Sequence, residues 1–419
     1  MSLLLTHATI HNKQQNLLIH NGLIAYLGNQ FPEATHTINL SGKHIIPGMI
    51  DPHTHIRDLR QTDKEDWTSA SKAAIKGGVT TVFDMPNNRP PTVNLEYLNL
   101  KREVAKKSLV HYKFNIAATA DNLDGVQEML ASNPQDVASL KLFLAGSNSN
   151  EFVNDHDVIK RIFEFSLQYE LPVMIHSEWQ ACVEEFSRKV SKPTILDHHY
   201  IRNRKCAAIG TEVVLKIAQA IGNKIYIAHT SVAEELDLIR AYKDKVQVFC
   251  EITPHHLLIN ELILKEVGNY GKVNPPLRTP DDNQALWQAI ADGTVDTIGS
   301  DHAPHRLNEK NKEYAQAPSG FPGLETSLPL LLQEVKKGNL TLERLVQLTS
   351  THAAKIFGLE KTGKIKEGYR ADLVVFDLKK SGVVCAQEFE TKAKYSPFEG
   401  MEIVPIEQVF VQGKHYTLA

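Results

Sequence analysis

Few cysteines occur in the 419 residues, and no two of them form a Cys-x-x-Cys pair; they are Cys182, Cys206, Cys250 and Cys385. Such scattered cysteines favour a reduced, cytoplasmic protein. There is no Gly-x-Ser-x-Gly motif, and no cysteine ends a predicted strand, so nothing supports a serine or cysteine nucleophile. We expect Cys250, directly before Glu251, to pack in the core.

The sequence also lacks a surplus of positive charge and a long hydrophobic run. Lys and Arg total 46 against 49 Asp and Glu, a net charge of −3, so nothing predicts binding to nucleic acid or to anionic membranes. The apolar runs are shorter than the roughly 18–20 residues that span a bilayer. The first residues lack the features of a signal peptide. With 42% hydrophobic and 23% charged residues, the composition is that of an ordinary globular protein.

Eight short apolar or β-branched runs, separated by helical patterns, predict eight parallel strands. They cover residues 44–51, 79–85, 113–119, 137–143, 171–176, 224–229, 246–251 and 295–301. Residues 63–78 and 154–170 each begin with Asp or Asn, which favour helix N-termini, and their apolar residues have helical spacing. The alternation predicts an α/β fold, a (β/α)₈ barrel of the TIM type, with a doubly wound sheet as the alternative.

The two ends of the chain do not follow this alternation. Residues 1–43 and 364–419 have the pattern of short strands with turns, and we expect them to form one small composite β-sandwich domain. Residues 44–363 would form the barrel. The stretch 302–323 is long, polar and rich in proline and glycine, which predicts a loop over the mouth of the barrel.

Metal-binding side chains gather at the predicted strand ends. Six residues share this position, within or directly after five different strands: His53, His55, Lys141, His176, His229 and Asp301. The first two are separated by one residue, so their side chains point to the same side of an extended segment. Alone, such a pair is more typical of two partly exposed polar histidines near a strand end. Because barrel active sites lie at the carboxyl ends of the strands, the full set predicts a metal centre.

The ligand types indicate which metal would bind. Imidazole and carboxylate without thiolate suit Zn²⁺, Mn²⁺ or Co²⁺. The set exceeds the three protein ligands usual for one catalytic zinc, so it suits two ions. Two cations need a bridging anion, and Lys141 would supply one if its amine formed a carbamate with CO₂. Lysine is rarely buried; an ion pair inside the barrel is the alternative for Lys141.

Asp301, in the segment SDHAPH (300–305), is the predicted catalytic residue. A carboxylate that binds a metal through one oxygen can take the proton of a metal-bound water with the other. The metal lowers the pKa of that water towards about 7, so hydroxide forms at neutral pH. The reaction indicated is hydrolytic attack on an amide-like carbonyl.

Other residues are candidates for substrate binding. Arg57 comes two residues after the histidine pair, so it points into the same site, where bidentate binding of a carboxylate is its best use. Asn87 and His305 would add further donors. A surface salt bridge to Asp58 is the alternative for Arg57, and a turn is the alternative for Asn87. His302 is predicted to orient its neighbours rather than to bind metal.

Motifs along nearly the whole chain resemble those of the dihydroorotases, which are cyclic amidases of the amidohydrolase superfamily. The matching segments are DPHTHIRD (51–58), MPNN (85–88), LKLFL (140–144), IHSE (175–178), IAHTS (227–231), EITPHHL (251–257), VNPPLR (273–278), SDHAPH (300–305) and GFPGLET (320–326). The histidine pair and the aspartate of the eighth strand mark the superfamily. The arginine after the pair, together with DHAPH, is more specific to dihydroorotases.

The resemblance implies a barrel with a flanking β-domain and a binuclear zinc centre. The implied reaction is the reversible cyclisation of N-carbamoyl-L-aspartate to L-dihydroorotate with loss of water, in pyrimidine biosynthesis. The partners that it implies are a second copy of the chain, in a homodimer, and a transcarbamoylase.

The resemblance also assigns roles residue by residue. The six predicted ligands would hold the metals, with Lys141 carboxylated and Asp301 as general acid and base. The residues that it places against the substrate are Arg57, Asn87, Asn274 and His305. Glu251 and His256 lie in a segment that the family uses variably. Many bacterial relatives bridge their metals with an aspartate after the fourth strand, but KLFLAGSNSN (141–150) contains none, which favours the carboxylated lysine.

Two alternatives have different functions. Hydantoinases (dihydropyrimidinases) and allantoinases share the metal site but act on rings that lack this carboxylate, and Arg57 with His305 argues against them. An inactive dihydroorotase-like partner of a transcarbamoylase would be a protein of another class. Such proteins typically lose metal ligands, whereas this sequence keeps all six.

Overall fold

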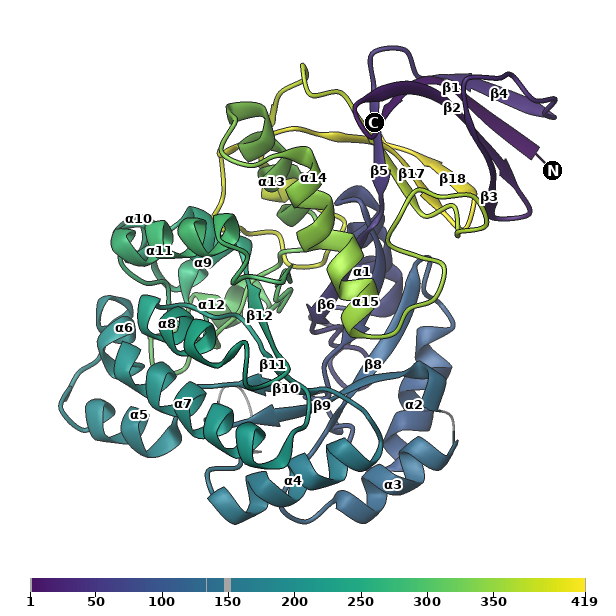
Figure 1. Cartoon of the computed structure of the whole chain (residues 1–419). Helices are drawn as coiled ribbons and strands as arrows, with labels where there is room; N and C mark the ends of the chain where they lie inside the picture. The colour runs from purple at the N-terminus through teal and green to yellow at the C-terminus, as the bar shows by residue number, and fades with distance from the viewer. Residues whose placement is uncertain (1, 133, 147–151, 419) are drawn as a thin grey trace.

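Eight parallel strands form a nearly closed barrel in the computed structural model, which describes residues 2–132, 134–146 and 152–418 (Figure 1). In order around the barrel they are β6 (Met49–Thr54), β7 (Val79–Asp84), β8 (His111–Ala117), β9 (Val137–Phe143), β10 (Val173–His176), β11 (Ile225–Ile227), β12 (Val248–Ile252) and β13 (Thr297–Ile298). A parallel bridge between Thr54 and His302 connects the two ends of the sheet. The predicted (β/α)₈ fold is confirmed.

Helices cover the outside of the barrel (Figure 1). The longer ones are α1 (Trp67–Lys76), α2 (Leu95–Ala105), α3 (Leu123–Ser132), α4 (His156–Gln168), α7 (Arg204–Ile221), α8 (Ala233–Tyr242), α11 (Pro280–Ala291) and α13 (Ser327–Lys337). The short ones are α5 (Gln180–Ser187), α6 (His198–Ile201), α9 (Pro254–Leu258), α10 (Leu264–Val267), α12 (Leu307–Lys310), α14 (Leu342–Val346) and α15 (His352–Ile356). None of the helices in the described part of the chain is both long and apolar enough to span a membrane.

Both predicted helices are present, but each is shorter than expected. The helix predicted over 63–78 begins only at Trp67, because the Asp66 carboxylate accepts hydrogen bonds from the backbone N–H groups of Thr68 and Ser69. The helix predicted over 154–170 is α4, which Asp155 caps in the same way and which buries its apolar side against the barrel.

Strands from both ends of the chain form a second sheet (Figure 1). Its strands are β1 (Ser2–Ile10), β2 (Lys13–His20), β3 (Leu23–Gly28), β4 (His36–Asn39), β5 (His44–Pro47), β14 (Leu373–Phe376), β17 (Ile406–Val411) and β18 (Lys414–Thr417). A separate short pair is β15 (Gly382–Val383) with β16 (Glu402–Ile403). The terminal sheet buries its own apolar cluster, which includes Leu5, Leu17 and Phe410.

The prediction of one barrel strand over 44–51 is wrong. Residues 44–47 form β5, which pairs with β14 of the terminal sheet, and the barrel strand β6 begins at Met49. Gly48 lies between them, where a Cβ atom would overlap the side chain of Thr80. The chain therefore passes from one sheet to the other at a position where β7 leaves no room for a side chain.

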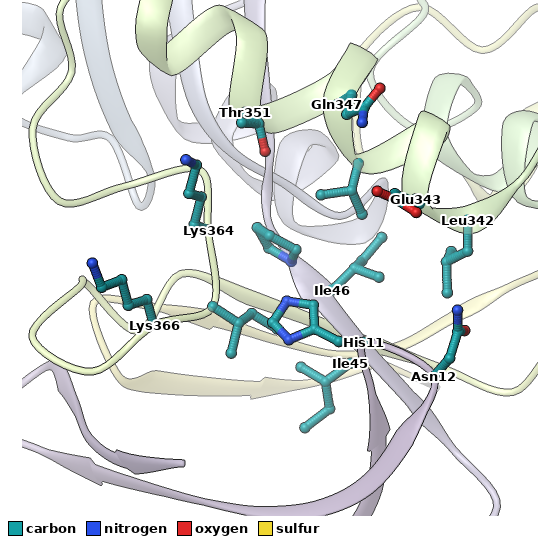
Figure 2. Close-up of a pocket in the computed structure, with 13 residues that line it drawn as sticks. His11, Asn12, Ile45, Ile46, Leu342, Glu343, Gln347, Thr351, Lys364 and Lys366 are labelled. Atoms are coloured by element: carbon teal, nitrogen blue, oxygen red, sulfur yellow. The ribbon is translucent and has the colours of Figure 1, made fainter. Parts of the chain in front are cut away.

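A cavity of about 550 Å³ lies where the terminal sheet meets the barrel (Figure 2). Aliphatic side chains of Ile45, Ile46 and Leu342 line it, together with Lys364 and Lys366. None of the predicted site residues borders this cavity. It is therefore separate from the candidate metal centre.

The segment 302–323 is a loop with one short helix, α12, and much of it is buried. The buried ammonium of Lys310 donates to the carbonyl groups of Lys272, Pro318 and Gly320. Lys272 in turn donates to the carbonyl of Ala317. These contacts hold the loop against the barrel, where Ser319 and Gly320 border the cavity that contains the histidines.

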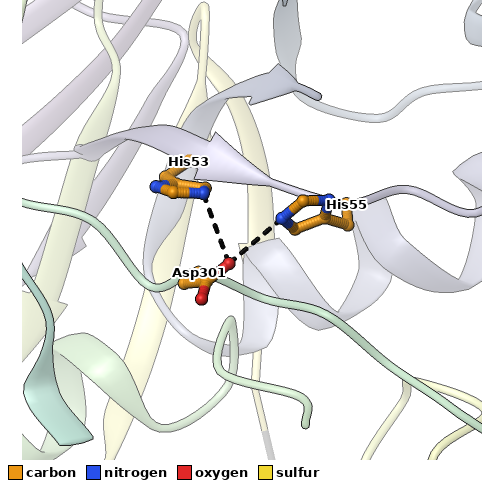
Figure 3. A group of neighbouring side chains, drawn as sticks. All are labelled: His53, His55 and Asp301. Atoms are coloured by element: carbon orange, nitrogen blue, oxygen red, sulfur yellow. Dashed lines mark hydrogen bonds and ion pairs between the residues drawn. The ribbon is translucent and has the colours of Figure 1, made fainter. Parts of the chain in front are cut away.

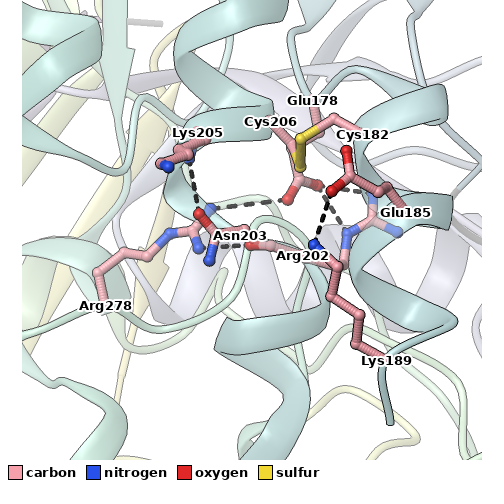
Figure 4. Close-up of a disulfide and its surroundings, with 9 residues drawn as sticks. All are labelled: Glu178, Cys182, Glu185, Lys189, Arg202, Asn203, Lys205, Cys206 and Arg278. Carbon is pink, nitrogen blue, oxygen red and sulfur yellow. Dashed lines mark hydrogen bonds and ion pairs between the residues drawn. A yellow bond between two sulfur atoms is a disulfide. The ribbon is translucent and has the colours of Figure 1, made fainter.

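The expectation of uniformly reduced cysteines is wrong. Cys182 in α5 and Cys206 in α7 form a disulfide (Figure 4). Their separation of 24 residues carries no recognisable spacing, and only the packing of α5 against α7 brings them together. Cys250 is free and buried in the core, as predicted.

Candidate metal centre and substrate cavity

His53, His55 and Asp301 form a compact buried group at the carboxyl end of the barrel (Figure 3). Oδ1 of Asp301 lies 3.1 Å from Nε2 of His55 and 3.3 Å from Nε2 of His53. Asp301 adopts the left-handed backbone conformation, with φ of 48°. Side chains other than glycine rarely adopt this conformation, and such strain is concentrated at functional sites.

Both histidines are oriented through their Nδ1 atoms. Nδ1 of His53 lies 2.8 Å from Oε1 of Glu251, and Nδ1 of His55 lies 2.7 Å from Oδ1 of Asn87. These oxygens accept hydrogen bonds, so each Nδ1 carries the proton and each Nε2 presents a lone pair. Burial lowers the pKa of His55 to about 4, although Asp301 opposes this shift. Neutral His55 is therefore suited to binding a cation.

The contacts of Asp301 indicate that a cation belongs between these groups. Burial raises the pKa of Asp301, but a proton on the facing nitrogens of His53 and His55 outweighs this effect and holds the pKa well below its usual range. With both imidazoles neutral, the ionised carboxylate would instead face two lone pairs at 3.1 and 3.3 Å. Three acceptors at this distance repel one another unless a proton or a metal ion lies among them. This donor set fits a divalent cation.

A second group of nitrogen ligands lies beside the first. Nδ1 of His176, at the end of β10, is 3.0 Å from Nε2 of His229, which follows β11. Nε2 of His176 lies 2.9 Å from the Glu178 carboxylate and donates to it, so its Nδ1 is free to bind metal. The rings of His53 and His229 are 5.1 Å apart, centre to centre. The two groups can therefore hold two neighbouring cations.

Lys141 lies in β9 and is buried, with 1% of its surface exposed. Its Nζ atom makes no hydrogen bond or ion pair with the residues that the structure describes, and its nearest cation–π contact is the Phe143 ring at 4.9 Å. Burial lowers the pKa of Lys141 to about 8, against the opposing charges of Glu251 and Asp301. An unpaired amine with a lowered pKa fits carbamate formation, and the alternative ion pair is not formed.

Arg57 lies beside the first group and is 3% exposed. Nε donates to the Pro304 carbonyl over 3.3 Å, and Nη2 is 3.2 Å from Nε2 of His305. Burial lowers its pKa to about 10, against the opposing charge of Asp301. The alternative salt bridge to Asp58 is not formed, because that carboxylate accepts from the backbone of Leu59 and Trp67. No carboxylate of a described residue lies within ion-pair distance of Arg57.

The other predicted substrate residues border the same space. His53, His176, Asp301, Asn87 and Asn274 line one small cavity, and Asn87 also borders a larger one of about 730 Å³. Arg57 and His305 line the larger cavity. Besides its predicted role, Asn87 fixes the orientation of His55, and Oδ1 of Asn274 contacts Nε2 of His198 over 3.0 Å.

The side chains of two histidines that the sequence singled out contact groups other than the proposed metal ligands. Nδ1 of His302 accepts a hydrogen bond from the backbone N–H of Gly323, and Nε2 lies 3.4 Å from Glu65. His302 therefore supports the loop at 302–323. His256 contacts the carbonyls of Pro275 and Pro276, which follow Asn274.

Sequence reasoning missed the role of Glu178 and Arg202. The Glu178 carboxylate accepts from His176 and also from Nε of Arg202, over 2.8 Å, and all three side chains are buried. The Cys182–Cys206 disulfide, near this ion pair in Figure 4, joins α5, which follows Glu178 in the chain, to α7, which follows Arg202. The available signal was the position of Glu178 two residues after a predicted ligand, in IHSE (175–178).

Comparison with known proteins agrees with this geometry. The profile of the amidohydrolase family matches residues 44–415. The chain belongs to the amidohydrolase family. An enzyme of the hydrolase class was predicted, and this membership confirms it. All the candidate metal ligands described above lie in the region that the family profile matches.

Similar sequences and similar structures carry different names. A dihydroorotase of Methanosphaera stadtmanae is 35% identical over 94% of this chain and 91% of its own length. A dihydroorotase of Methanosarcina mazei is 34% identical over 95% of this chain and 89% of its own length. The L-hydantoinase (dihydropyrimidinase) of Arthrobacter aurescens has a TM-score of 0.94 with 27% identity, and covers 100% of this chain and 97% of its own. The fold therefore does not distinguish these substrates, and the side chains of the cavity must.

Proposed function

We propose that this protein is a dihydroorotase, which converts N-carbamoyl-L-aspartate reversibly to L-dihydroorotate with loss of water in pyrimidine biosynthesis. The observation that carries the proposal is Arg57, a buried guanidinium without a carboxylate partner among the described residues. Burying a charge is costly unless it is paired. The carboxylate of dihydroorotate would supply the missing partner, whereas hydantoin has no such group.

The charges around the larger cavity support an anionic substrate. Its lining includes five cationic side chains and one carboxylate: Arg57, Lys64, Arg89, Arg202, Lys312 and Glu309. A cavity with this excess of positive charge attracts anions and raises their association rate. N-carbamoyl-L-aspartate carries two carboxylates, so it would gain more from this field than a neutral ring.

The proposed chemistry divides between the metals and the protein. Two divalent cations, which we propose to be Zn²⁺ with Mn²⁺ or Co²⁺ as alternatives, would supply Lewis acidity and lower the pKa of water. They would be held by His53, His55, His176, His229, Asp301 and the carbamate of Lys141. Asp301 would take a proton from the attacking water and deliver it to the ring nitrogen as the amide bond breaks. Cyclisation would reverse these steps.

Substrate orientation would come from the residues around Arg57. Arg57 and His305 would bind the carboxylate, with Asn87 and Asn274 as further contacts. The loop at 302–323 would limit the access of water, since Ser319 and Gly320 border the inner cavity. A homodimer, association with a transcarbamoylase and a cytoplasmic location stay predictions.

The alternative activity is that of a hydantoinase, which the TM-score of 0.94 to the Arthrobacter enzyme favours. The test is ring opening of dihydroorotate and hydantoin, measured side by side on protein reconstituted with Zn²⁺. We expect dihydroorotate to be preferred by about 100-fold or more in kcat/KM, because a site built for a polar group rejects analogues that lack it. A preference for hydantoin would assign the alternative. An absence of turnover with metal bound would indicate an inactive partner protein.

A further inference from the structure

Lys64 contacts His305 on the side of the imidazole opposite to Arg57. Lys64 lies in the turn before α1, and its Nζ atom is 3.2 Å from Nδ1 of His305. The same ammonium forms an ion pair of 3.0 Å with Oε1 of Glu309. Only 13% of the Lys64 side chain is exposed. The residue is therefore held in place rather than projecting into solvent.

This contact determines which nitrogen of His305 carries the proton. A lysine ammonium only donates hydrogen bonds, so Nδ1 of His305 must accept. The single proton of the neutral imidazole then lies on Nε2. In agreement, Nε2 is 3.1 Å from the carbonyl oxygen of Ser319, which only accepts. A guanidinium also only donates, so with the proton on Nε2 the 3.2 Å contact from Nη2 of Arg57 is not a hydrogen bond and brings two N–H donors side by side.

We propose that Lys64 is a positioning residue for substrate binding: it fixes the Nε2–H tautomer of His305, so that His305 and Arg57 donate together to one substrate carboxylate. The inference rests on the proposed function and adds a residue that determines specificity. Two adjacent N–H donors match the two oxygens of a carboxylate, which would share the Nε2–H with the Ser319 carbonyl or take its place. A neutral ring such as hydantoin would gain nothing from them.

Glu309 makes Lys64 necessary. Oε2 of Glu309 lies 3.9 Å from Nδ1 of His305. Without the ammonium, this carboxylate would attract a proton to Nδ1, and Nε2 would become an acceptor. An acceptor at Nε2 would repel the substrate carboxylate and would pair instead with Arg57.

The surroundings of His305 favour its neutral form, so the tautomer matters. Burial lowers the pKa of His305 well below its ordinary value, and Arg57, Lys64 and Lys310 lower it further. Glu309, on α12, is the one carboxylate among the described residues that lies within 4.0 Å of the ring nitrogens. Buried Tyr395, which faces this region from the C-terminal part of the chain, has a raised pKa and is neutral.

The kinetic test uses Lys64→Met, with Lys64→Arg as the conservative variant, in the zinc-loaded enzyme. Losing one hydrogen bond to a charged group corresponds to about 10- to 100-fold in affinity. We therefore expect Lys64→Met to raise KM for dihydroorotate by about 10-fold or more, with kcat and metal content unchanged. Hydantoin turnover should not change. The KM of Lys64→Arg for dihydroorotate should stay close to the wild-type value. An unchanged KM for dihydroorotate would overturn the inference.

A double variant tests the competition with Glu309. Adding Glu309→Gln to Lys64→Met removes the carboxylate that stabilises the wrong tautomer, so KM should fall back towards the wild-type value. A purely structural role of Lys64 predicts the opposite, because the double variant loses more contacts. A KM that rises further would therefore contradict the proposal.

The tautomer can also be observed without activity. Nitrogen NMR of protein labelled with ¹⁵N-histidine distinguishes Nδ1–H from Nε2–H, and His305→Asn assigns the signal. We expect Nε2–H in the wild type and Nδ1–H in Lys64→Met. Nδ1–H in the wild type would overturn the inference even if dihydroorotate is the substrate. Nε2–H would uphold the effect of Lys64 on the tautomer even if the proposed substrate proved wrong.

Discussion

Glu251 accepts a hydrogen bond of 2.8 Å from Nδ1 of His53, and both side chains are almost completely buried. The same oxygen accepts the backbone N–H of His229, and the other oxygen accepts the hydroxyl of Tyr226. One carboxylate thus orients a candidate ligand of the first metal and fixes the backbone at a ligand of the second. Glu251 is therefore central to the geometry of both proposed metal sites.

Replacing Glu251 with Gln should weaken metal binding. The amide offers only one acceptor oxygen, so its NH₂ group would face either the Tyr226 hydroxyl or the donors of His53 and His229. Groups that orient a ligating histidine contribute about 10- to 100-fold in metal affinity, and we expect a loss of that size. Competition with a zinc chelator measures it. Tyr226→Phe removes only the hydroxyl that donates to the other oxygen of Glu251, so it should weaken zinc binding less. Equal zinc affinity in Glu251→Gln and wild type would refute the role of Glu251 in orienting the ligands.

Lys141→Met should remove the bridging group. We expect the bound zinc to fall from two ions to one, and kcat/KM to fall by more than about 100-fold, beyond the loss typical of residues that only orient ligands. Elemental analysis and the ring-opening assay measure both quantities. Lys113→Met is the matched control, because Lys113 lies on the neighbouring strand and donates to the Gln135 carbonyl. Two bound ions with normal activity in Lys141→Met would exclude the carbamate bridge.

Arg57→Met should affect substrate binding and not metal binding. The carboxylate of dihydroorotate would lose its bidentate partner, which corresponds to about 10- to 100-fold in KM. Zinc content and hydantoin turnover should stay unchanged. Arg60→Met is a suitable control, since Arg60 is exposed. The carboxylate role fails if KM for dihydroorotate is the same in Arg57→Met and wild type.

Asp372 should make the stability of the fold depend on pH. Its Oδ1 atom lies 3.0 Å from Nε2 of His111 in β8 and 2.7 Å from the backbone N of Gln412, so it ties the barrel to the terminal sheet. Burial raises its pKa, but His111 and Arg370 outweigh burial, and the pKa in the folded protein is lowered.

The sign of the effect follows from that lowered pKa. The ionised Asp372 carboxylate stabilises the folded protein. This contribution is complete above the unfolded-state pKa of about 3.9, and it is lost as the pH falls through the lower, folded-state pKa. Asp372→Asn should therefore reduce the free energy of unfolding by about 1–3 kcal/mol at pH 7, and by less below pH 4. Urea unfolding at both pH values measures this, with exposed Asp121→Asn as control. A loss that is independent of pH would show that charge is not involved.

Much of the fold was predictable because its signals are local. Apolar runs that alternate with helical patterns identify parallel strands, and parallel strands place their carboxyl ends at one edge. The sequence could therefore predict that His53, His176, His229 and Asp301 lie together, as they do. The break at Gly48 was not predictable, because 44–51 is continuous as an apolar run and only contact with Thr80 and β14 divides it.

The residue types at the strand ends were determined by the sequence alone, and they already indicated metal-dependent hydrolysis. Which nitrogen of each histidine faces the cavity was decided only by tertiary structure. His53 and Glu251 are 198 residues apart, Lys64 and His305 are 241 apart, and Cys182 meets Cys206 only through helix packing. Which ring nitrogen of a histidine carries the proton depends on the hydrogen-bond partner within about 3 Å of it. No local pattern in the chain encodes a partner so distant in sequence.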